Sequence, residues 1–298
     1  MEEAIVFAPA TVANVCCGFD RLGFALDSPG DVVAVRKSKE GIRFVAIHGA
    51  ELSLAPEENV AAVAAASFLK RKNIDSGLEM ELWKGYPVGS GIGSSSASAV
   101  AGAMAAAALF DFDKHDPDVL QAALDGEEVA SLSRHADNVG PCLFGGWVIA
   151  SHQKNIQCHK IQTDIDVQAV ILHPHIEVKT ADSRRVLPES VSLSLAIKQA
   201  GHFGLMVHAL HANDLGLMET ALKDEIIEPH RKELLLAFDQ TKKVAISNGA
   251  LGGGISGSGP STFWLCHSEN KTRLAHELDQ LAQTFKLPYS IYQGPISP

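Results

Sequence analysis

The segment Pro87–Ala97 constrains the fold more than any other part of the sequence, because its glycines alternate with other residues and three serines follow. Glycine lets backbone N–H groups turn inward without obstruction by a Cβ atom. The serines open a predicted helix at Ser94–Leu109, whose mostly small side chains allow close packing in the core. Free N–H groups and a partial positive charge at a helix N-terminus suit an anion such as a triphosphate. The segment therefore predicts a phosphate site at the start of a buried helix.

Two other phosphate-binding loops do not fit this segment. A Walker A loop needs a lysine and then serine or threonine after its last glycine, but Gly93 is followed by Ser94 and Ser95. The dinucleotide fingerprint needs the spacing G-x-G-x-x-G, and here the spacing is G-x-G-x-G. A purely structural turn, capped by serine before a buried helix, remains the alternative.

Two further segments are rich in glycine and small residues, Pro9–Leu26 and Gly249–Thr262. In the first, Asn14 and Asp20 stand among apolar residues, so each needs a partner if it is buried. Turn formation is the alternative, because Asn and Asp favour loops. The glycines of the second segment predict an unusual backbone or close approach to a ligand. A flexible surface loop is the alternative there, although a strand is predicted directly after it.

The rest of the chain alternates between strand and helix patterns. Strands are predicted at Ala4–Phe7, Val32–Val35, Ile42–Ile47, Leu78–Trp83, Gly145–Ser151, Val167–His173, Thr262–Cys266 and Ser290–Tyr292. Helices are predicted at Asn59–Lys72, Ser94–Leu109, Asp116–Ser131, Ser190–Ala212, Leu215–Leu222, Glu233–Ser247 and Thr272–Phe285. Runs of strands followed by runs of helices, twice over, indicate an α+β protein with two halves. The weakly patterned segment 152–166 is the expected boundary, which gives an N-terminal domain at 1–158 and a C-terminal domain at 159–298.

Composition narrows the class of protein. The 298 residues carry a formal net charge of −10, which argues against nucleic acid as a partner. The five cysteines are odd in number and show no zinc-site spacing, so reduced thiols are expected. The N-terminus lacks the basic region of a signal peptide, and the alanine-rich stretch 97–110 is too short to span a bilayer. These features predict a cytoplasmic protein without a membrane partner.

Taken together, the three glycine-rich segments resemble the three signature motifs of the GHMP kinases, in order and in spacing. The middle motif of that superfamily, P-x-x-x-G-L-G-S-S-A, is matched at Pro87–Ala97 with Ile92 for leucine and one extra serine. The third is matched closely at Ile255–Pro260, whereas Cys16 and Cys17 replace the usual Gly-Pro of the first. The resemblance implies a ribosomal-protein-S5-domain-2-like N-terminal domain, a ferredoxin-like C-terminal domain and a site between them.

Within the superfamily, four runs resemble the homoserine kinase family: Gly18–Gly23, His135–Asn138, Arg184–Pro188 and Glu228–Arg231. This resemblance implies transfer of the γ-phosphoryl group of ATP to the side-chain hydroxyl of L-homoserine, a step of threonine biosynthesis. It also implies a homodimer. Two alternatives stay open, a GHMP kinase for another small alcohol such as mevalonate or a diphosphocytidyl-methylerythritol, and a ligand-binding member without catalysis.

The resemblance implies a nucleotide site around the middle motif. Ser95 and Glu127 would hold Mg²⁺, which prefers hard oxygen ligands, unless Glu127 is a solvated helix residue. Asn59 would contact the adenine, and Lys84 would lie either at the nucleotide or on the solvated surface. The complete set of residues expected at ATP is Asn59, Lys84, Pro87, Val88, Gly89, Ser90, Gly91, Ile92, Gly93, Ser94, Ser95 and Ser96.

For the substrate, the resemblance implies a pocket for a carboxylate, an ammonium group and a hydroxyl. Arg184 and Arg231 are expected to clamp the carboxylate, since guanidinium binds it bidentately; Arg185 is a weaker alternative to Arg184. The polar residues expected to complete the pocket are Asn14, Asp20, His135 and Asp137. A structural role is the alternative for His135, and Thr180 is expected near Arg184.

The general base is left open by the sequence. Asp20 or Asp137 could take the proton, and a mechanism without a base is equally consistent, because a loose transition state develops little charge on the nucleophile early. The catalytic set expected from the resemblance is Asp20, Asp137, Glu127 and Ser95.

Overall fold

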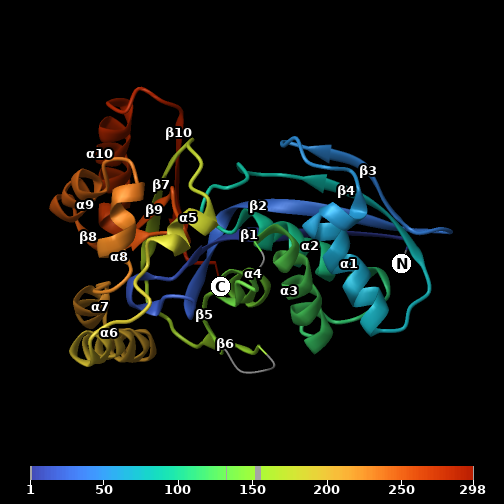
Figure 1. The fold of residues 1–298 in the computed structure, drawn as a ribbon, viewed down its shortest axis with the longest axis horizontal. Coiled ribbons are helices and arrows are strands. Elements are labelled where there is room, and N and C mark those ends of the chain that lie inside the picture. The colour runs from blue at the N-terminus through green and yellow to red at the C-terminus, as the bar shows by residue number, and fades with distance from the viewer. Residues whose placement is uncertain (1, 132, 152–155, 298) are drawn as a thin grey trace.

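The computed structural model describes residues 2–131, 133–151 and 156–297 and has two halves (Figure 1). In the N-terminal half, a mixed sheet has the strand order β3-β4-β2-β5-β6, with β1 along the other side of β2. Its strands are β1 (Glu3–Ala13), β2 (Leu22–Ser38), β3 (Ile42–His48), β4 (Gly77–Trp83), β5 (Trp147–Ala150) and β6 (Cys158–Ile161). The long strand β2 organises this sheet, because Val32–Ser38 pairs with β4 and Leu22–Phe24 pairs with β5.

Helices of small residues pack against this sheet. They are α1 (Val60–Arg71), α2 (Ser94–Leu109), α3 (Pro117–Ser131) and α4 (Ala136–Phe144). Nearly all of α2 is buried, as its alanines and serines predict. A Cβ atom on Gly102 would come within 2.2 Å of the Ala61 carbonyl oxygen, so glycine is required where α2 crosses α1. Close crossing of this kind fixes the position of the α2 N-terminus.

The C-terminal half is built on an antiparallel sheet of order β10-β7-β9-β8. Its strands are β7 (Gln168–Pro174), β8 (Ala250–Ile255), β9 (Thr262–Cys266) and β10 (Tyr289–Pro295). Its helices are α5 (Thr180–Arg185), α6 (Leu193–Ala212), α7 (Leu215–Ala221), α8 (Glu228–Arg231), α9 (Phe238–Ser247) and α10 (Lys271–Gln283). Short 3-10 helices lie at Cys16–Gly18, Pro56–Glu58, Lys232–Leu234 and Ser268–Asn270. Helices α9 and α10 pack on the sheet around Trp264 and Leu278.

The two halves share one continuous hydrophobic core. Phe24 of β2 packs between Trp147 of β5 and Phe263 of β9, at ring-centroid distances of 4.7 and 5.8 Å. The C-terminal segment returns to the first sheet, where Ile296 bridges to Leu26. The halves are therefore joined by packed side chains as well as by the connecting chain.

Most predicted elements are found, and the differences have clear causes. The glycine-rich run Ala250–Ile255 is the buried strand β8, so the flexible-loop alternative is wrong there. The predicted helix Glu233–Ser247 begins only at Phe238, because residues 232–234 form a 3-10 turn. Helices α4 and α5 were not predicted from the sequence. In the described residues no helix has the length and apolar character needed to cross a membrane. The predicted domain boundary at 158/159 stays a prediction.

Candidate active site

The three glycines of the loop before α2 have a left-handed backbone. Gly89, Gly91 and Gly93 have φ values of 71°, 77° and 72°. A Cβ atom on Gly91 would lie 2.5 Å from the Gly259 carbonyl oxygen, and one on Gly93 would lie 2.2 Å from Thr11 Oγ1. Side chains are therefore excluded at Gly91 and Gly93 by sterics as well as by φ.

Residues from both other glycine-rich segments hold this loop. Ser256 Oγ donates to the Gly91 carbonyl at 2.8 Å, and Ser261 Oγ donates to the Ser90 carbonyl at 2.5 Å. From the first segment, the Thr11 N–H donates to the Ile92 carbonyl at 3.1 Å. These bonds use carbonyl groups of the loop.

The N-terminus of α2 offers donors that have no side-chain partner among the described residues. No side chain caps it, and Gly93 is its N-cap residue. The hydroxyls of Ser90 and Ser94 are buried and have no partner in the described residues. An anion bound here would satisfy both the free helix N–H groups and these hydroxyls, which is the arrangement that a phosphate needs.

Glu127 of α3 faces this helix end. Its carboxylate accepts hydrogen bonds from Ser95 Oγ at 3.1 Å and from Ser96 Oγ at 2.9 Å. The residue is only 2% exposed, so the alternative of a solvated helix residue is wrong. A buried carboxylate beside a hydroxyl is a hard oxygen pair that fits Mg²⁺, with phosphate oxygens and water completing the shell. The described residues contain no cluster of three or more His, Cys, Asp or Glu that would form a metal site alone.

Asn59 and Lys84 have structural partners. Asn59 caps α1, where its Oδ1 accepts from the Ala61 N–H at 3.1 Å. The Lys84 side chain is 2% exposed and ion-paired with fully buried Asp31, so its predicted surface alternative is wrong. Its Nζ also donates to the Ser94 carbonyl at 2.8 Å, which braces the first turn of α2 from within the core.

The loop after β1 joins the glycine-rich segments to the substrate side. Asn14 Oδ1 accepts from the Asp20 N–H at 2.9 Å, and Asn14 Nδ2 donates to the Gly257 carbonyl at 2.7 Å. Both residues have positive φ, so the turn chemistry expected of them is present. The Asn14 N–H also donates to Asp137 Oδ2 at 3.2 Å, which brings the loop to α4. The loop that forms this turn is therefore also part of the candidate pocket.

A cavity of about 440 Å³ lies beside this loop. It is lined by Asp20, Ser133, Arg134, His135, Asp137, Ile156 and Arg184. Both terminal nitrogens of Arg184 donate to the Asp20 carboxylate, at 3.0 and 2.9 Å. Arg185 points elsewhere, is exposed and pairs with Asp182. Of the two arginines considered at this position, Arg184 therefore lines the cavity.

Arg231 lies deeper and has backbone partners. Its Nε donates to the Ser183 carbonyl at 2.9 Å, and its Nη1 donates to the Gly257 carbonyl at 3.1 Å. It lines a separate cavity of about 10 Å³, together with Asn14. Burial, reinforced by the positive charge of Arg184, lowers the pKa of Arg231 to about 10. Thr180, expected near Arg184, has its hydroxyl 3.5 Å from Ser258 Oγ.

His135 connects the cavity to the phosphate side. Its Nδ1 lies 3.2 Å from Glu127 Oε1. Burial opposes its protonation, but the hydrogen bond and negative charge of Glu127 outweigh this and raise the pKa of His135. Oε1 of Glu127 therefore contacts both Ser95 and a residue that lines the cavity.

Asp137 is buried in the cavity wall. Burial, reinforced by the negative charge of Asp20, raises the pKa of Asp137 to about 6. A carboxyl group with this pKa is partly protonated near neutral pH and can exchange a proton with a substrate hydroxyl.

Replacing Asp137 with Asn tests this pKa. The native state binds the Asp137 proton more tightly than the unfolded state, so the stability that this group contributes is present below about pH 4 and is lost as pH rises through about 6. Asp137→Asn should therefore stabilise the protein by up to about 3 kcal/mol more at high pH than at low pH. Urea unfolding of both proteins at about pH 4 and about pH 8 measures the difference; an equal effect at both would contradict the raised pKa.

Comparisons with known proteins agree with this geometry. Residues 59–146 match the GHMP kinases N terminal domain, and residues 206–286 match the GHMP kinases C terminal domain. A homoserine kinase from Chlorobium phaeobacteroides is 36% identical, over 99% of this chain and 98% of its own length. One from Xanthomonas campestris is 39% identical, over 88% and 82%. The chain belongs to the homoserine kinase family of the GHMP kinases.

Solved structures place this GHMP kinase in the same fold. The crystal structure of a homoserine kinase from Cytophaga hutchinsonii has a TM-score of 0.95 and 40% identity, covering 100% of this chain and 96% of that one. An L. major mevalonate kinase has a TM-score of 0.75 at 16% identity, with 98% of this chain and 95% of that one covered, and this likeness shows the fold alone. The predicted α+β two-domain GHMP architecture is thereby confirmed.

Sequence reasoning missed several residues of this GHMP kinase site. Asn138 accepts from Thr11 Oγ1 at 2.8 Å, directly beside Gly93. Asp31 holds Lys84 beneath α2, and nothing in its local sequence distinguishes it from a surface strand residue. Arg134 lines the cavity, and its position next to His135 was a signal that could have found it.

Proposed function

We propose that this chain transfers the γ-phosphoryl group of ATP to the side-chain hydroxyl of L-homoserine. The observation that carries the proposal is the position of Glu127, which contacts Ser95 at the helix N-terminus and His135 in the wall of the larger cavity. A phosphate donor and an alcohol acceptor bound on either side would meet at this carboxylate. Phosphoryl transfer needs such positioning and charge neutralisation more than covalent participation by the protein.

On the nucleotide side, we propose that the free N–H groups from Gly89 to Ser96 bind the phosphates and that Ser95 and Glu127 hold Mg²⁺. When bound, the metal neutralises the charge on the transferring phosphoryl group. The side chains of Asn59 and Lys84 cap α1 and brace α2. They support the site by fixing these helices.

On the substrate side, we propose that Arg184 binds the substrate carboxylate and that Asp20 receives the ammonium group. The bidentate pair between Arg184 and Asp20 would open to admit a zwitterion, whose two charges replace the two partners. Asn14 and Arg231 position the loop and Gly257, while Asp137 and His135 face the hydroxyl. The raised pKa of Asp137 favours this residue as the proton acceptor.

A coupled assay of ADP formation tests the proposed activity. The rate of ADP formation by purified protein with Mg-ATP is measured with L-homoserine as the acceptor and, separately, with mevalonate. We expect turnover with homoserine and none above background with mevalonate, because the larger cavity carries arginines and carboxylates suited to an amino acid. Turnover with mevalonate alone would reject the proposal.

We also propose a cytoplasmic homodimer, with a second copy on the outer face of α6. Leu193 and Ile197 are 76% and 63% exposed on this helix, whose one Asp, Glu, Lys or Arg residue is Lys198. Gly201 and Gly204 have no atoms within 4 Å of an added Cβ, so the monomer gives no reason for glycine there. Each glycine costs about 1 kcal/mol relative to alanine in a helix, and a second helix approaching closely would explain both.

The dimer is tested by sedimentation. Wild-type protein is expected to sediment as a dimer and Ile197→Lys as a folded monomer, because a charge at the centre of an apolar contact is not paired. Leu54→Lys, which changes an exposed apolar residue outside α6, serves as the control and should remain dimeric. A wild-type monomer at micromolar concentration would reject this assignment.

A further inference from the structure

Arg134 lines the larger cavity, and the proposed function gives it no role. Arg134 directly precedes His135, the N-cap residue of α4. The sequence predicted Arg184 and Arg231 as the carboxylate clamp. Arg231 lines the smaller cavity, and the charges of Arg184, Asp20 and Asp137 act on its guanidinium. Within the described part of the chain, the arginines that line the larger cavity are Arg184 and Arg134.

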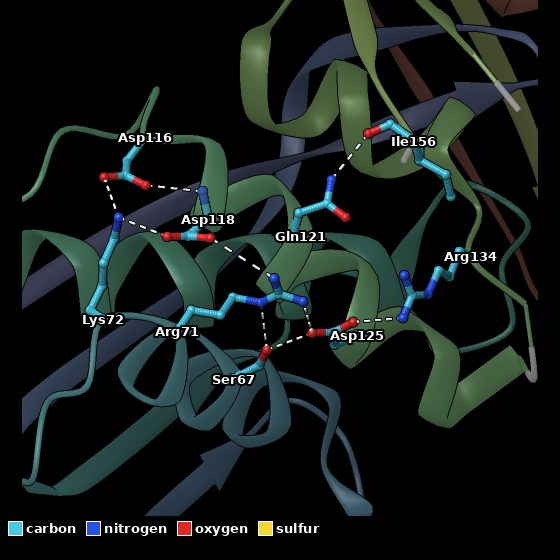
Figure 2. Close-up of polar contacts among 9 residues, drawn as sticks. All are labelled: Ser67, Arg71, Lys72, Asp116, Asp118, Gln121, Asp125, Arg134 and Ile156. Atoms are coloured by element: carbon cyan, nitrogen blue, oxygen red, sulfur yellow. Dashed lines mark hydrogen bonds and ion pairs between the residues drawn. The ribbon is translucent and has the colours of Figure 1, made fainter. Parts of the chain in front are cut away.

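Arg134 is held in place from α3. Its Nη2 donates to Asp125 Oδ1 at 2.8 Å, and its Nε donates to Glu128 Oε2 at 2.9 Å. The other oxygen of Asp125 accepts from Ser67 Oγ at 2.6 Å and from Arg71 Nη2 at 2.7 Å, both on α1 (Figure 2). The partner of Arg134 is therefore itself fixed by a second helix.

The same face of α3 holds another part of the cavity wall. Gln121 Nε2 donates to the carbonyl of Ile156 at 3.0 Å, and Ile156 lines the cavity with Arg134 (Figure 2). Gln121, Asp125 and Glu128 are spaced at i, i+4 and i+7, which puts them on one side of a helix. This stripe thus supports two lining residues from behind.

Arg134 keeps donors that no described residue uses. Its Nη1 has no partner in the described residues, and the side chain is 38% exposed. By contrast, both terminal nitrogens of Arg184 already donate to Asp20. A planar group with spare N–H donors, fixed in a cavity wall, suits recognition of a carboxylate.

We propose that Arg134 is a second substrate-binding arginine, which receives the carboxylate of the substrate while the α3 stripe orients it. The inference rests on the proposed function, because it takes the substrate to be an amino acid. Held in this way, Arg134 selects an acceptor that carries a carboxylate over one of the same length that lacks it.

The test compares two acceptors, L-homoserine and 3-aminopropan-1-ol, in steady-state assays with saturating ATP. The second acceptor, called aminopropanol below, is homoserine without its carboxylate. Arg134→Gln should raise the KM for homoserine about tenfold or more with little change in kcat, because one charge-assisted hydrogen bond is lost. Its KM for aminopropanol should be unchanged. Arg134→Lys keeps the charge, so its KM for homoserine should rise less than that of Arg134→Gln, and its KM for aminopropanol should be unchanged.

Arg36→Gln is the matched control, because Arg36 forms an exposed ion pair with Glu3 away from the cavity and should behave as wild type. An equal rise of KM for both acceptors in either Arg134 variant would overturn the proposal and leave a structural role. No change for either acceptor would also overturn it. If the wild type itself fails to phosphorylate homoserine, the proposed function is rejected first, and this inference with it.

Discussion

Glu127→Gln is expected to lower kcat about a thousandfold while the dissociation constant for homoserine changes only a few-fold. The substitution keeps the size of the side chain and its ability to accept from Ser96 Oγ, but it removes the negative charge beside Ser95. A neutral amide is a poor ligand for Mg²⁺, so the transferring phosphoryl group loses its counter-charge. Isothermal titration with homoserine and a single-turnover assay measure the two quantities separately.

Glu219→Gln provides the control for this experiment. Glu219 is an exposed carboxylate on α7, outside both cavities, and its loss should leave both quantities unchanged. Equal loss of turnover and of homoserine binding in Glu127→Gln would instead show that Glu127 mainly holds His135 and the cavity wall. Lower magnesium affinity with normal homoserine binding would support its role as a ligand.

Lys84→Met is expected to reduce the free energy of unfolding by about 3–5 kcal/mol, because it leaves the Asp31 carboxylate buried without its cation. Asp31 is fully buried, and its remaining donors are Ser98 Oγ at 2.7 Å and the Gly85 N–H at 3.1 Å. Burial lowers the pKa of Lys84, against the opposing charge of Asp31, so the pair is costly to form and costlier to break. Urea unfolding followed by circular dichroism measures the loss.

The double substitution Lys84→Met with Asp31→Asn should recover much of that stability, because neither side chain then carries an unpaired charge. Lys232→Met removes an exposed lysine paired with Asp239 and should have a much smaller effect. If Lys84→Met unfolds like the wild type but binds ATP poorly, Lys84 acts at the nucleotide and not as a brace for α2.

The local features of the site were predictable because they depend on local sequence. Positive φ at Gly91 and Gly93 follows from the glycine spacing, and burial of α2 follows from its small residues. The contacts that hold these local features together join residues that are more than a hundred positions apart in the sequence. The contacts from Ser256 to Gly91 and from Arg184 to Asp20 arise only when the two halves pack. No periodic pattern in the sequence predicts such contacts.

Short and irregular elements were missed for a related reason. Helix α4 contains Pro141 and helix α5 has six residues, so neither shows a sustained helical pattern. Strand β8 is glycine-rich because an added Cβ on Gly253 would lie 2.0 Å from the Phe263 carbonyl oxygen. Tertiary contact, and not strand propensity, selects its residues. The burial of Lys84 beside Asp31 was not predicted, because this partner is 53 positions away in the sequence.

The hydroxyl of Ser256 and that of Ser261 reach the loop before α2 from the opposite half of the molecule. A ligand bound by that loop therefore stabilises the folded state of both halves together, by its binding free energy. Heating should then produce one cooperative melting transition that moves upward as a whole with nucleotide concentration. A fragment ending near the middle of the chain would lack half of the scaffold on which nucleotide capture depends.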